Sequence, residues 1–275
     1  MPANPDYPEL ASGKAHWRYQ PGSTCLQDQV ILITGAGDGI GRTAAKTFAL
    51  HGANVILLGR TRSKLEAVFD WITDHTDTEP VIVPCDLLAL DDNSANALAQ
   101  AIEEGFGRLD GILHNASLLG PKTPVAYYPS EDWTKVMQVN AFAPFLLTRT
   151  LLPLLQQSAN ASVVMTSSSV GRQGRAYWGA YAVSKFALEG LCQVLADEHE
   201  NANRVRFNSL NPGGTRTAMR ATAYPAEDPG EVPTPESRMD IYLYLFEQAS
   251  LSLTGAQLDA RTWKGPQAPT AAPAS

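Results

Sequence analysis

The sequence predicts an α/β protein built as a doubly wound parallel sheet with helices on both faces. Short runs of Val, Ile and Leu recur along the chain without the polar alternation of a sheet that has one face in water. Stretches with the apolar spacing of helices separate these runs, which is typical of parallel sheets joined by crossover helices. The first run also passes directly into a glycine-rich loop and then into a helical stretch. In sheets of this kind, ligands bind at the carboxyl ends of the strands.

The individual elements follow from the same patterns. The runs expected to be strands are 29–34, 54–59, 80–85, 110–115, 161–167 and 204–210. Helices are expected between them: a first that ends near residue 50, a second from about 63, others over 94–106 and 131–157, and one that ends near 200. Because crossovers between parallel strands are right-handed, these helices cover both faces of the sheet.

The chain of 275 residues is long enough for one α/β domain of the larger kind. No internal repeat or linker interrupts the central block, so we predict one domain over 29–264. Residues 1–28 are rich in proline and polar residues and are interpreted as an N-terminal arm. Residues 265–275, "GPQAPTAAPAS", have the composition of a flexible tail.

Composition excludes several classes of protein. A formal net charge of −7 argues against a nucleic-acid-binding protein, which needs a basic face. No apolar run reaches membrane-spanning length, because Arg149 and Pro153 interrupt "FLLTRTLLPLL". Cys25, Cys85 and Cys192 are scattered, so they predict neither a disulfide framework nor a metal site. We expect reduced thiols in a cytoplasmic protein.

The glycine-rich loop, "TGAGDGIG" at 34–41, has the pattern T-G-x-x-x-G-x-G through Gly35, Gly39 and Gly41. Glycine permits the tight turn and lets the backbone approach a pyrophosphate closely. The helix that begins near Ile40 directs its N-terminal N–H groups at such an anion. An ordinary glycine-rich turn is the alternative, but a strand before and a helix after favour a Rossmann-like dinucleotide site.

The end of the second strand indicates which dinucleotide. Sites that prefer NAD usually carry an acid there, whereas this chain has Gly59 followed by Arg60, with Arg62 nearby. A guanidinium suits the 2′-phosphate of NADP(H). We therefore expect NADP(H) to be preferred, with NAD(H) possible, although Asp38 in the glycine loop would oppose that preference if it faced the phosphate. Surface charges at a helix start are the alternative.

Three residues of "AYWGAYAVSKFALEG" (176–190) are spaced four apart. Tyr177, Tyr181 and Lys185 fall on one face of a predicted helix. Taken alone, the spacing fits a partly buried helix with a surface lysine equally well.

The order of motifs along the chain decides between these interpretations. The glycine loop is followed by "HNA", "MQVN", "TSSSVG", Y-x-x-x-K and "NPGG". In this order, from about 29 to 260, the sequence resembles the short-chain dehydrogenase/reductase family. The stretches "DGIGR", "LDGILHNASLLG", "GAYAVSKFALEG" and "NPGGTRTAMRA" are similar to its YciK-type bacterial oxidoreductases. The resemblance implies hydride transfer between NADP(H) and a carbonyl or alcohol substrate, as in a carbonyl reductase or alcohol dehydrogenase.

The resemblance also implies the catalytic roles. Tyr181 is the general acid/base, because Tyr177 has another tyrosine rather than lysine at the required offset. Lys185 would bind the nicotinamide ribose, and its ammonium is expected to lower the Tyr181 pKa from about 10. Ser168 would hydrogen-bond the substrate carbonyl, with the adjacent serines as alternatives, and Asn140 would hold a water. Tyr177 is then a packing residue or a substrate-facing one, with packing favoured.

The cofactor contacts implied by the resemblance are distributed along the whole domain: Gly35, Gly39, Ile40, Gly41, Arg60, Asp86, Leu87, Asn115, Ala116, Lys185, Pro212, Gly213, Thr215 and Thr217. The chain departs from the family pattern at two places. "HNAS" replaces N-N-A-G, which puts His114 and Ser117 at its ends, and the C-terminal D-G-G is absent. His114 is interpreted as a core residue.

The substrate-facing residues are predicted as Ser168, Tyr181 and Met219. Residues 216–236 have the prolines and polar residues of a lid, with Met219, Ala221 and Tyr224 as its apolar inner face. The substrate itself is not predicted beyond a small carbonyl or alcohol compound.

A homodimer or homotetramer is expected, because apolar residues surround much of the last long helix: Phe186, Leu188, Leu191, Val194 and Leu195. Two other functions use the same fold. A cofactor-binding regulatory or scaffold protein would be favoured by a broken catalytic set, but Asn140, Ser168, Tyr181 and Lys185 are all present. An epimerase or dehydratase is disfavoured because the chain has no substantial C-terminal substrate domain.

Overall fold

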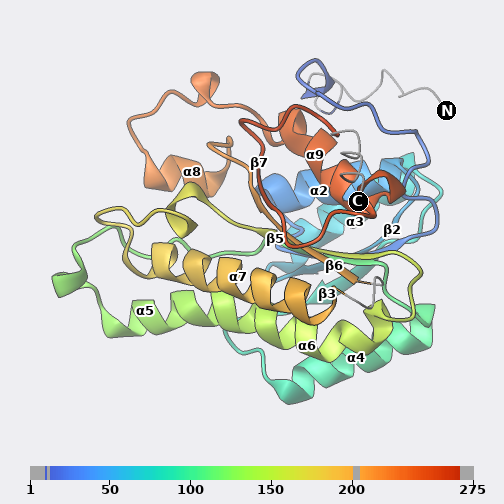
Figure 1. The fold of residues 1–275 in the computed structure, drawn as a ribbon, viewed down its shortest axis with the longest axis horizontal. Coiled ribbons are helices and arrows are strands. Elements are labelled where there is room, and N and C mark those ends of the chain that lie inside the picture. Colours follow the sequence, from blue (N-terminus) through green and yellow to red (C-terminus); the bar gives the residue numbers. More distant parts are fainter. Residues whose placement is uncertain (1–9, 11–12, 201–204, 267–275) are drawn as a thin grey trace, which may run out of the picture.

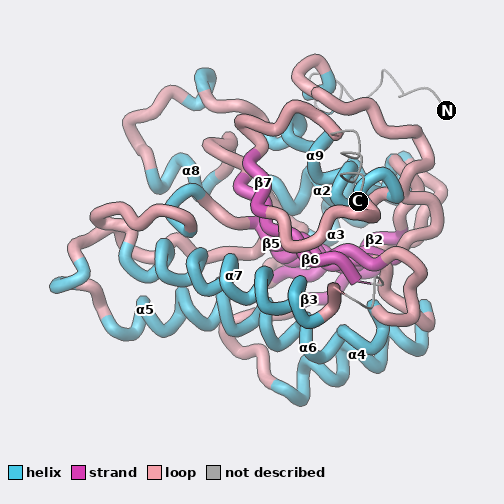
Figure 2. The backbone as a smooth tube through the Cα atoms, in the orientation of Figure 1, coloured by secondary structure: helices cyan, strands magenta, loops and turns pink. Residues whose placement is uncertain are grey.

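The computed structural model describes residue 10 and residues 13–200 and 205–266. Within these residues the strands form one parallel sheet of seven, in the order β3-β2-β1-β4-β5-β6-β7 (Figures 1 and 2). This confirms the predicted fold class. The strands are β1 (Val30–Thr34), β2 (Asn54–Gly59), β3 (Val81–Pro84), β4 (Gly111–His114), β5 (Ala161–Thr166), β6 (Val205–Asn211) and β7 (Gln257–Asp259).

The order of strands reverses between β1 and β4. The chain moves outward from β1 through β2 to β3 and then returns to the other side of β1 as β4. The connections from these two central strands therefore leave in opposite directions and open a crevice at their carboxyl ends. The glycine loop after β1 lies at this crevice.

Helices cover both faces of the sheet. Figure 1 shows α2, α3 and α9 on one side and α4, α5, α6 and α7 on the other. The helices are α2 (Gly39–Leu50), α3 (Arg62–His75), α4 (Asp92–Phe106), α5 (Ser130–Met137), α6 (Ala143–Leu155), α7 (Gly179–Glu198), α8 (Ala218–Ala223) and α9 (Met239–Phe246). Short turns of helix are η1 (Val125–Tyr127), η2 (Gln138–Phe142), η3 (Ser169–Gly171), η4 (Pro229–Glu231), η5 (Pro235–Arg238) and η6 (Gln248–Ser250).

Alternating side chains of one strand reach the two cores. Val30 and Leu32 pack with α4, α6 and α7, whereas Ile31 and Ile33 pack with α2, α3 and α9. Because successive side chains in a strand point to opposite faces, an uninterrupted apolar run is what a sheet covered on both sides requires. No helix in the described ranges is long and apolar enough to cross a membrane.

The structure differs from the sequence prediction in one divided helix and in three elements that were not predicted. The helix expected over 131–157 is divided into α5 and α6 by a π-helical turn, η2, which contains Asn140. Such turns add one residue to the helical repeat and are frequent at functional sites. The strand β7 was not predicted, because three residues carry too little pattern. α8 and α9 were not predicted either.

α7, which was expected to pair with a partner subunit, is covered more fully by its own chain than the sequence suggests. Leu188 is fully buried, and Leu191 and Leu195 pack against the same core, so three of the five apolar residues assigned to a partner lie inside the monomer. Phe186 and Val194 are exposed by 45% and 54%.

The described part of the predicted N-terminal arm packs on the C-terminal end of the domain. Trp17 donates its indole N–H to the carbonyl of Glu236 at 2.8 Å. The backbone N–H of Arg18 donates to Asp240 at 2.7 Å, and its guanidinium donates to the carbonyl of Ala260 at 2.9 Å. The tail predicted at 265–275 lies outside the described residues from 267 onwards.

Candidate active site

A cavity of about 700 Å³ lies at the carboxyl ends of the strands, where the fold predicts a binding site. Most residues predicted from the sequence line it: Gly35, Gly39, Ile40, Arg60, Asp86, Leu87, Asn115, Ala116, Ser168, Tyr181, Lys185, Pro212, Gly213, Thr215, Thr217 and Met219. Gly41 and Asn140 are not among the residues that line it. Both instead hold the walls in place, as described below.

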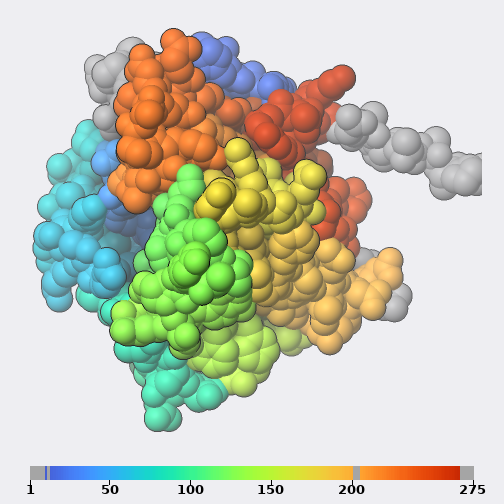
Figure 3. All heavy atoms as spheres, turned by 90° about the vertical axis from the view of Figure 1, so that its left-hand side faces the viewer, coloured from blue at the N-terminus to red at the C-terminus, as the bar shows by residue number. Residues whose placement is uncertain are grey.

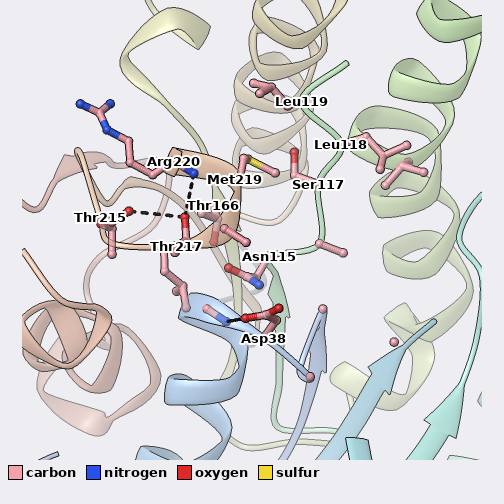
Figure 4. A pocket seen from close by; sticks show the side chains of 18 of the residues that line it. Asp38, Asn115, Ser117, Leu118, Leu119, Thr166, Thr215, Thr217, Met219 and Arg220 are labelled. Carbon is pink, nitrogen blue, oxygen red and sulfur yellow. Dashed lines mark hydrogen bonds between the residues drawn. The ribbon is translucent and has the colours of Figure 1, made fainter. Parts of the chain in front are cut away.

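The glycine loop needs glycine for two different reasons. Gly35 and Gly39 have φ angles of +69° and +49°, which residues with a Cβ adopt at a cost. Gly41 is required for packing, since a Cβ there would lie 2.2 Å from the carbonyl oxygen of Gly35. The side chain of Asp38 accepts a hydrogen bond from the N–H of Gly39 at 2.7 Å and so caps α2 (Figure 4).

Asp38, which would oppose NADP(H) if it faced the cofactor phosphate, lines the cavity with its carboxylate already paired. Its carboxylate pairs with Lys64 of α3 at 2.5 Å, and this hydrogen bond lowers the Asp38 pKa. Lys64 lines the cavity together with Arg60, so it is a second cation at this end that sequence reasoning missed. The sequence did contain an indication of this role, because Lys64 follows Arg62 by two residues in the same basic stretch. Arg62 itself pairs with Glu66 at 2.8 Å.

The turn after β4 is tied to the end of β1. Thr34 Oγ1 accepts hydrogen bonds from the N–H groups of Asn115 and Ala116, each at 3.0 Å. The amide of Asn115 also donates to the carbonyl of Thr34 at 3.2 Å. The "N-A" of the motif therefore fixes the floor of the cavity. Ser117 follows with a buried hydroxyl that has no hydrogen-bond partner among the described residues.

Tyr181 lies in the first third of α7 and is 9% exposed. Burial raises its pKa to about 12, and a side-chain hydrogen bond with Ser168 acts in the opposite direction. The chain alone therefore does not give Tyr181 the lowered pKa expected from the sequence, because desolvation outweighs the neighbouring groups. Ser168 lies two residues after the end of β5, and the intervening Ser167 also lines the cavity, with a buried hydroxyl that has no hydrogen-bond partner among the described residues.

Lys185 lies one turn beyond Tyr181 on the same face of α7. Its Nζ lies 5.6 Å from the centroid of the Tyr181 ring and donates to the carbonyl of Thr166 on β5 at 2.8 Å. The residue is 2% exposed, and burial lowers its pKa to about 8 while Glu189 opposes this shift. Spacing alone did not show that this lysine is buried.

Asn140 supports the cavity from behind. Its side-chain oxygen accepts from the N–H of Leu118 at 2.7 Å, and its amide donates to the Leu118 carbonyl at 2.9 Å and to Ser184 Oγ at 3.0 Å. The π-helical turn thereby connects the loop after β4 to α7. His114 is a core residue as interpreted: it is fully buried and its Nε2 lies 2.8 Å from Thr148 Oγ1.

The segment predicted as a lid forms the outer wall. Met219 and Tyr224 line the cavity, and Figure 4 shows Met219 beside Ser117. Thr217 caps α8 by accepting from the N–H of Arg220 at 3.1 Å. Ala221 was predicted to face inward, but it is exposed and does not line the cavity, because the helical repeat turns Ala223 inward instead. In Figure 3 this orange segment forms a lobe beside the green and yellow segments.

Tyr177 has neither of its expected roles. It is 58% exposed, has a φ angle of +70° and does not line the cavity. The next residue, Trp178, lines it instead, with its ring centroid 5.7 Å from that of Tyr181.

The residues present fit a nicotinamide dinucleotide. The glycine loop lines the cavity at the N-terminus of α2, where backbone N–H groups favour an anion such as a pyrophosphate. Arg60 and Lys64 provide cations at one end, and the unpaired hydroxyls of Ser117 and Ser167 provide polar groups at the other. Within one cavity, these features match the two halves of a dinucleotide.

Comparison with known families agrees with this site. The short chain dehydrogenase family model matches residues 29–228, so the chain belongs to this family of oxidoreductases. It is 52% identical to the uncharacterized oxidoreductase YciK of Escherichia coli K12 over 248 aligned residues. The aligned stretch covers 90% of this chain and 98% of the relative. Levodione reductase of Leifsonia aquatica is 30% identical over 208 residues, which are 75% of this chain and 77% of the relative.

Solved structures show the same similarity. The YciK structure from E. coli superposes with a TM-score of 0.86 at 53% identity, covering 88% of this chain and 99% of that one. A short chain dehydrogenase from Shigella flexneri in complex with NADP gives a TM-score of 0.85 at 52% identity, with 87% and 100% covered. One from E. coli CFT073 in complex with NADPH gives 0.85 at 52% identity, with 88% and 100% covered.

Proposed function

We propose that this protein is an NADP(H)-dependent oxidoreductase that interconverts a carbonyl compound and its alcohol, with Tyr181 as the general acid/base. The observation that carries the proposal is the arrangement of Ser168, Tyr181 and Lys185 in the same cavity as the glycine loop. The NADP and NADPH complexes of close relatives support the choice of cofactor.

Each residue has a distinct task in this proposal. When bound, the nicotinamide supplies or accepts the hydride. Ser168 donates a hydrogen bond to the substrate oxygen, and Tyr181 gives its proton to that oxygen during reduction. The Lys185 ammonium stabilises the resulting phenolate, which matters because burial otherwise disfavours that anion. Trp178 and Met219 cover the reacting atoms and restrict water.

A screen of aldehydes and ketones that follows NADPH absorbance tests this function. The panel includes levodione, since a relative at 30% identity is named for its reduction. We expect oxidation of NADPH with at least one carbonyl compound, at a rate that the Tyr181→Phe variant does not support. NADPH binding without turnover across a broad panel, in both directions of the reaction, would favour the regulatory protein instead.

We also propose a homodimer or homotetramer in the cytoplasm. Five apolar side chains on η2, α6 and α7 are exposed by 39% to 54%: Phe142, Phe145, Val183, Phe186 and Val194. Sedimentation should give a dimer or tetramer, and Phe186→Asp should reduce the assembly. Leu251→Asp is the control, because it makes the same kind of change at an apolar residue that lies outside η2, α6 and α7 and is exposed by 51%. A parent protein that is monomeric at micromolar concentration contradicts the proposal.

A further inference from the structure

One buried ion pair lies beside the proposed catalytic residues. Glu189 is one helical turn beyond Lys185 on α7, and its side chain is only 4% exposed. Arg172 Nε donates to one carboxylate oxygen at 2.8 Å, and Ser209 Oγ of β6 donates to the other at 2.7 Å. Arg172 also donates to Ser209 Oγ at 3.1 Å. The carboxylate on α7 is thus held by two other parts of the chain, the end of η3 and β6.

The position of this pair follows from close packing between η3 and α7. Gly171 lies against Lys185, since a Cβ on Gly171 would be 2.6 Å from the Lys185 Cβ. The backbone that carries Arg172 is therefore held directly against the helix that carries Lys185 and Glu189. Tyr181, Lys185 and Glu189 recur every four residues and lie along one buried face of α7.

The other groups around Lys185 leave Glu189 as the carboxylate that acts on it. His114 of β4 is neutral, because burial and Lys185 lower its pKa to about 3. β5 contributes the carbonyl of Thr166, which is uncharged, and η2 contributes Asn140, whose uncharged amide bonds to the neighbouring Ser184 of α7. On α5, Glu131 and Lys135 pair with each other at 2.5 Å at the surface.

We propose that Glu189 is a positioning residue that keeps Lys185 protonated, and that Arg172 limits this effect by neutralising part of the Glu189 charge. The inference rests on the proposed function only for its catalytic consequence. A buried ammonium with one carbonyl acceptor loses its proton readily, and a carboxylate on the same face opposes that loss. The lysine then keeps its proton to a higher pH than it would without Glu189 and can stabilise the Tyr181 phenolate up to that pH.

The two partners of the ion pair should have opposite effects, which distinguishes this role from simple support of the fold. Titration of Lys185 by NMR of ¹³Cε-labelled lysine, in the cofactor-free protein and with Lys185→Arg for assignment, measures its proton affinity directly. In Glu189→Gln the midpoint should fall by about one pH unit, because the carboxylate is lost and Arg172 remains. In Arg172→Gln it should rise.

Two further variants complete the design. The double variant Arg172→Gln/Glu189→Gln removes both charges and should titrate between the two single variants. Glu198→Gln, at the exposed end of the same helix, should leave the midpoint unchanged. With a substrate in hand, the alkaline limb of the kcat profile should move to lower pH in Glu189→Gln.

Equal shifts in the same direction, or no shift in either single variant, overturn the proposal. Because the titration uses the cofactor-free chain, its outcome does not depend on whether the enzyme turns over a carbonyl compound. Failure of the carbonyl screen and failure of this inference are therefore separate results.

Discussion

The two ends of the cavity use charge in different ways. At the catalytic end, Tyr181 and Lys185 are 9% and 2% exposed, and burial dominates their protonation. At the glycine-loop end, Arg60 is exposed, and the Lys64–Asp38 pair has side chains exposed by 54% and 52%. Water and salt screen charges at the exposed end, whereas desolvation magnifies them at the buried one. We therefore expect substitutions at the catalytic end to have the larger effects.

The largest effect is expected from Tyr181→Phe, which removes only the hydroxyl. Turnover should fall by about 10³-fold or more, since general acid/base catalysis contributes on the order of 10²–10⁴-fold. Cofactor affinity should stay within about twofold, because the ring that packs against Trp178 is retained. Steady-state rates and a fluorescence titration with NADPH measure the two quantities.

The matched control is Tyr177→Phe, which makes the same chemical change on an exposed side chain outside the cavity. Its turnover should be close to that of the parent. Near-normal turnover in Tyr181→Phe would show that Tyr181 is not the general acid/base. It would also contradict the expectation that substitutions at the buried end of the cavity have the larger effects.

The next effect concerns stability at acidic pH. His114 is neutral in the folded chain because its pKa is lowered to about 3, whereas the unfolded chain binds a proton below about 6.5. Stability is therefore lost as the pH falls from about 6.5 towards 3, by about 2 kcal/mol at pH 5. His114→Asn removes this term.

Urea unfolding of the parent and His114→Asn at pH 7 and pH 5 measures the difference. From pH 7 to pH 5, the free energy of unfolding should fall by about 2 kcal/mol less in the variant than in the parent. This difference does not depend on how stable the variant is at pH 7. Equal losses in the two proteins would show that His114 is not held neutral by its burial beside Lys185.

At the exposed end, Arg60→Ala should lower the preference for NADPH over NADH by about tenfold, the size of one charge-assisted hydrogen bond to a phosphate. The ratio of kcat/KM for the two cofactors measures it. A ratio that does not change in the variant would show that Arg60 does not face the 2′-phosphate.

The smallest effect is expected at the Lys64–Asp38 pair. Lys64→Met should lower the NADPH preference by a factor of about two to five, because an exposed ion pair contributes little and is screened by salt. Asp38→Asn should raise the preference slightly, since it frees the lysine. Changes of the same sign in both variants would contradict this account of the pair.

Much of the fold could be predicted because local pattern and tertiary environment agree in its centre. The centres of β1, β2 and β5 are apolar runs, and the sheet buries them on both faces. β7 escaped prediction because its three residues pair only after β6 is in place. The division of α5 from α6 escaped because a π-helical turn depends on contacts of Asn140 that no periodicity encodes.

The candidate site was predicted where a motif fixes backbone geometry, as in the glycine loop and Y-x-x-x-K. Two properties of the site could not be predicted from motifs: those set by how deeply a side chain is buried, and those set by a partner distant in sequence. The raised pKa of Tyr181 and the burial of Lys185 are of the first kind. The pairing of Asp38 with Lys64 is of the second, because the two residues approach only when α3 packs beside α2.

The central claim is that NADPH bound in this cavity gives a hydride to a carbonyl carbon while Tyr181 gives the proton to the carbonyl oxygen. Mass spectrometry of the alcohol formed from a carbonyl compound and NADPH that carries deuterium at both hydrogen positions of nicotinamide C4 tests it most directly. We predict one deuterium at the carbinol carbon in the parent and in Tyr177→Phe, and loss of product formation in Tyr181→Phe. Product without the label, or equal product from Tyr181→Phe, would contradict the account.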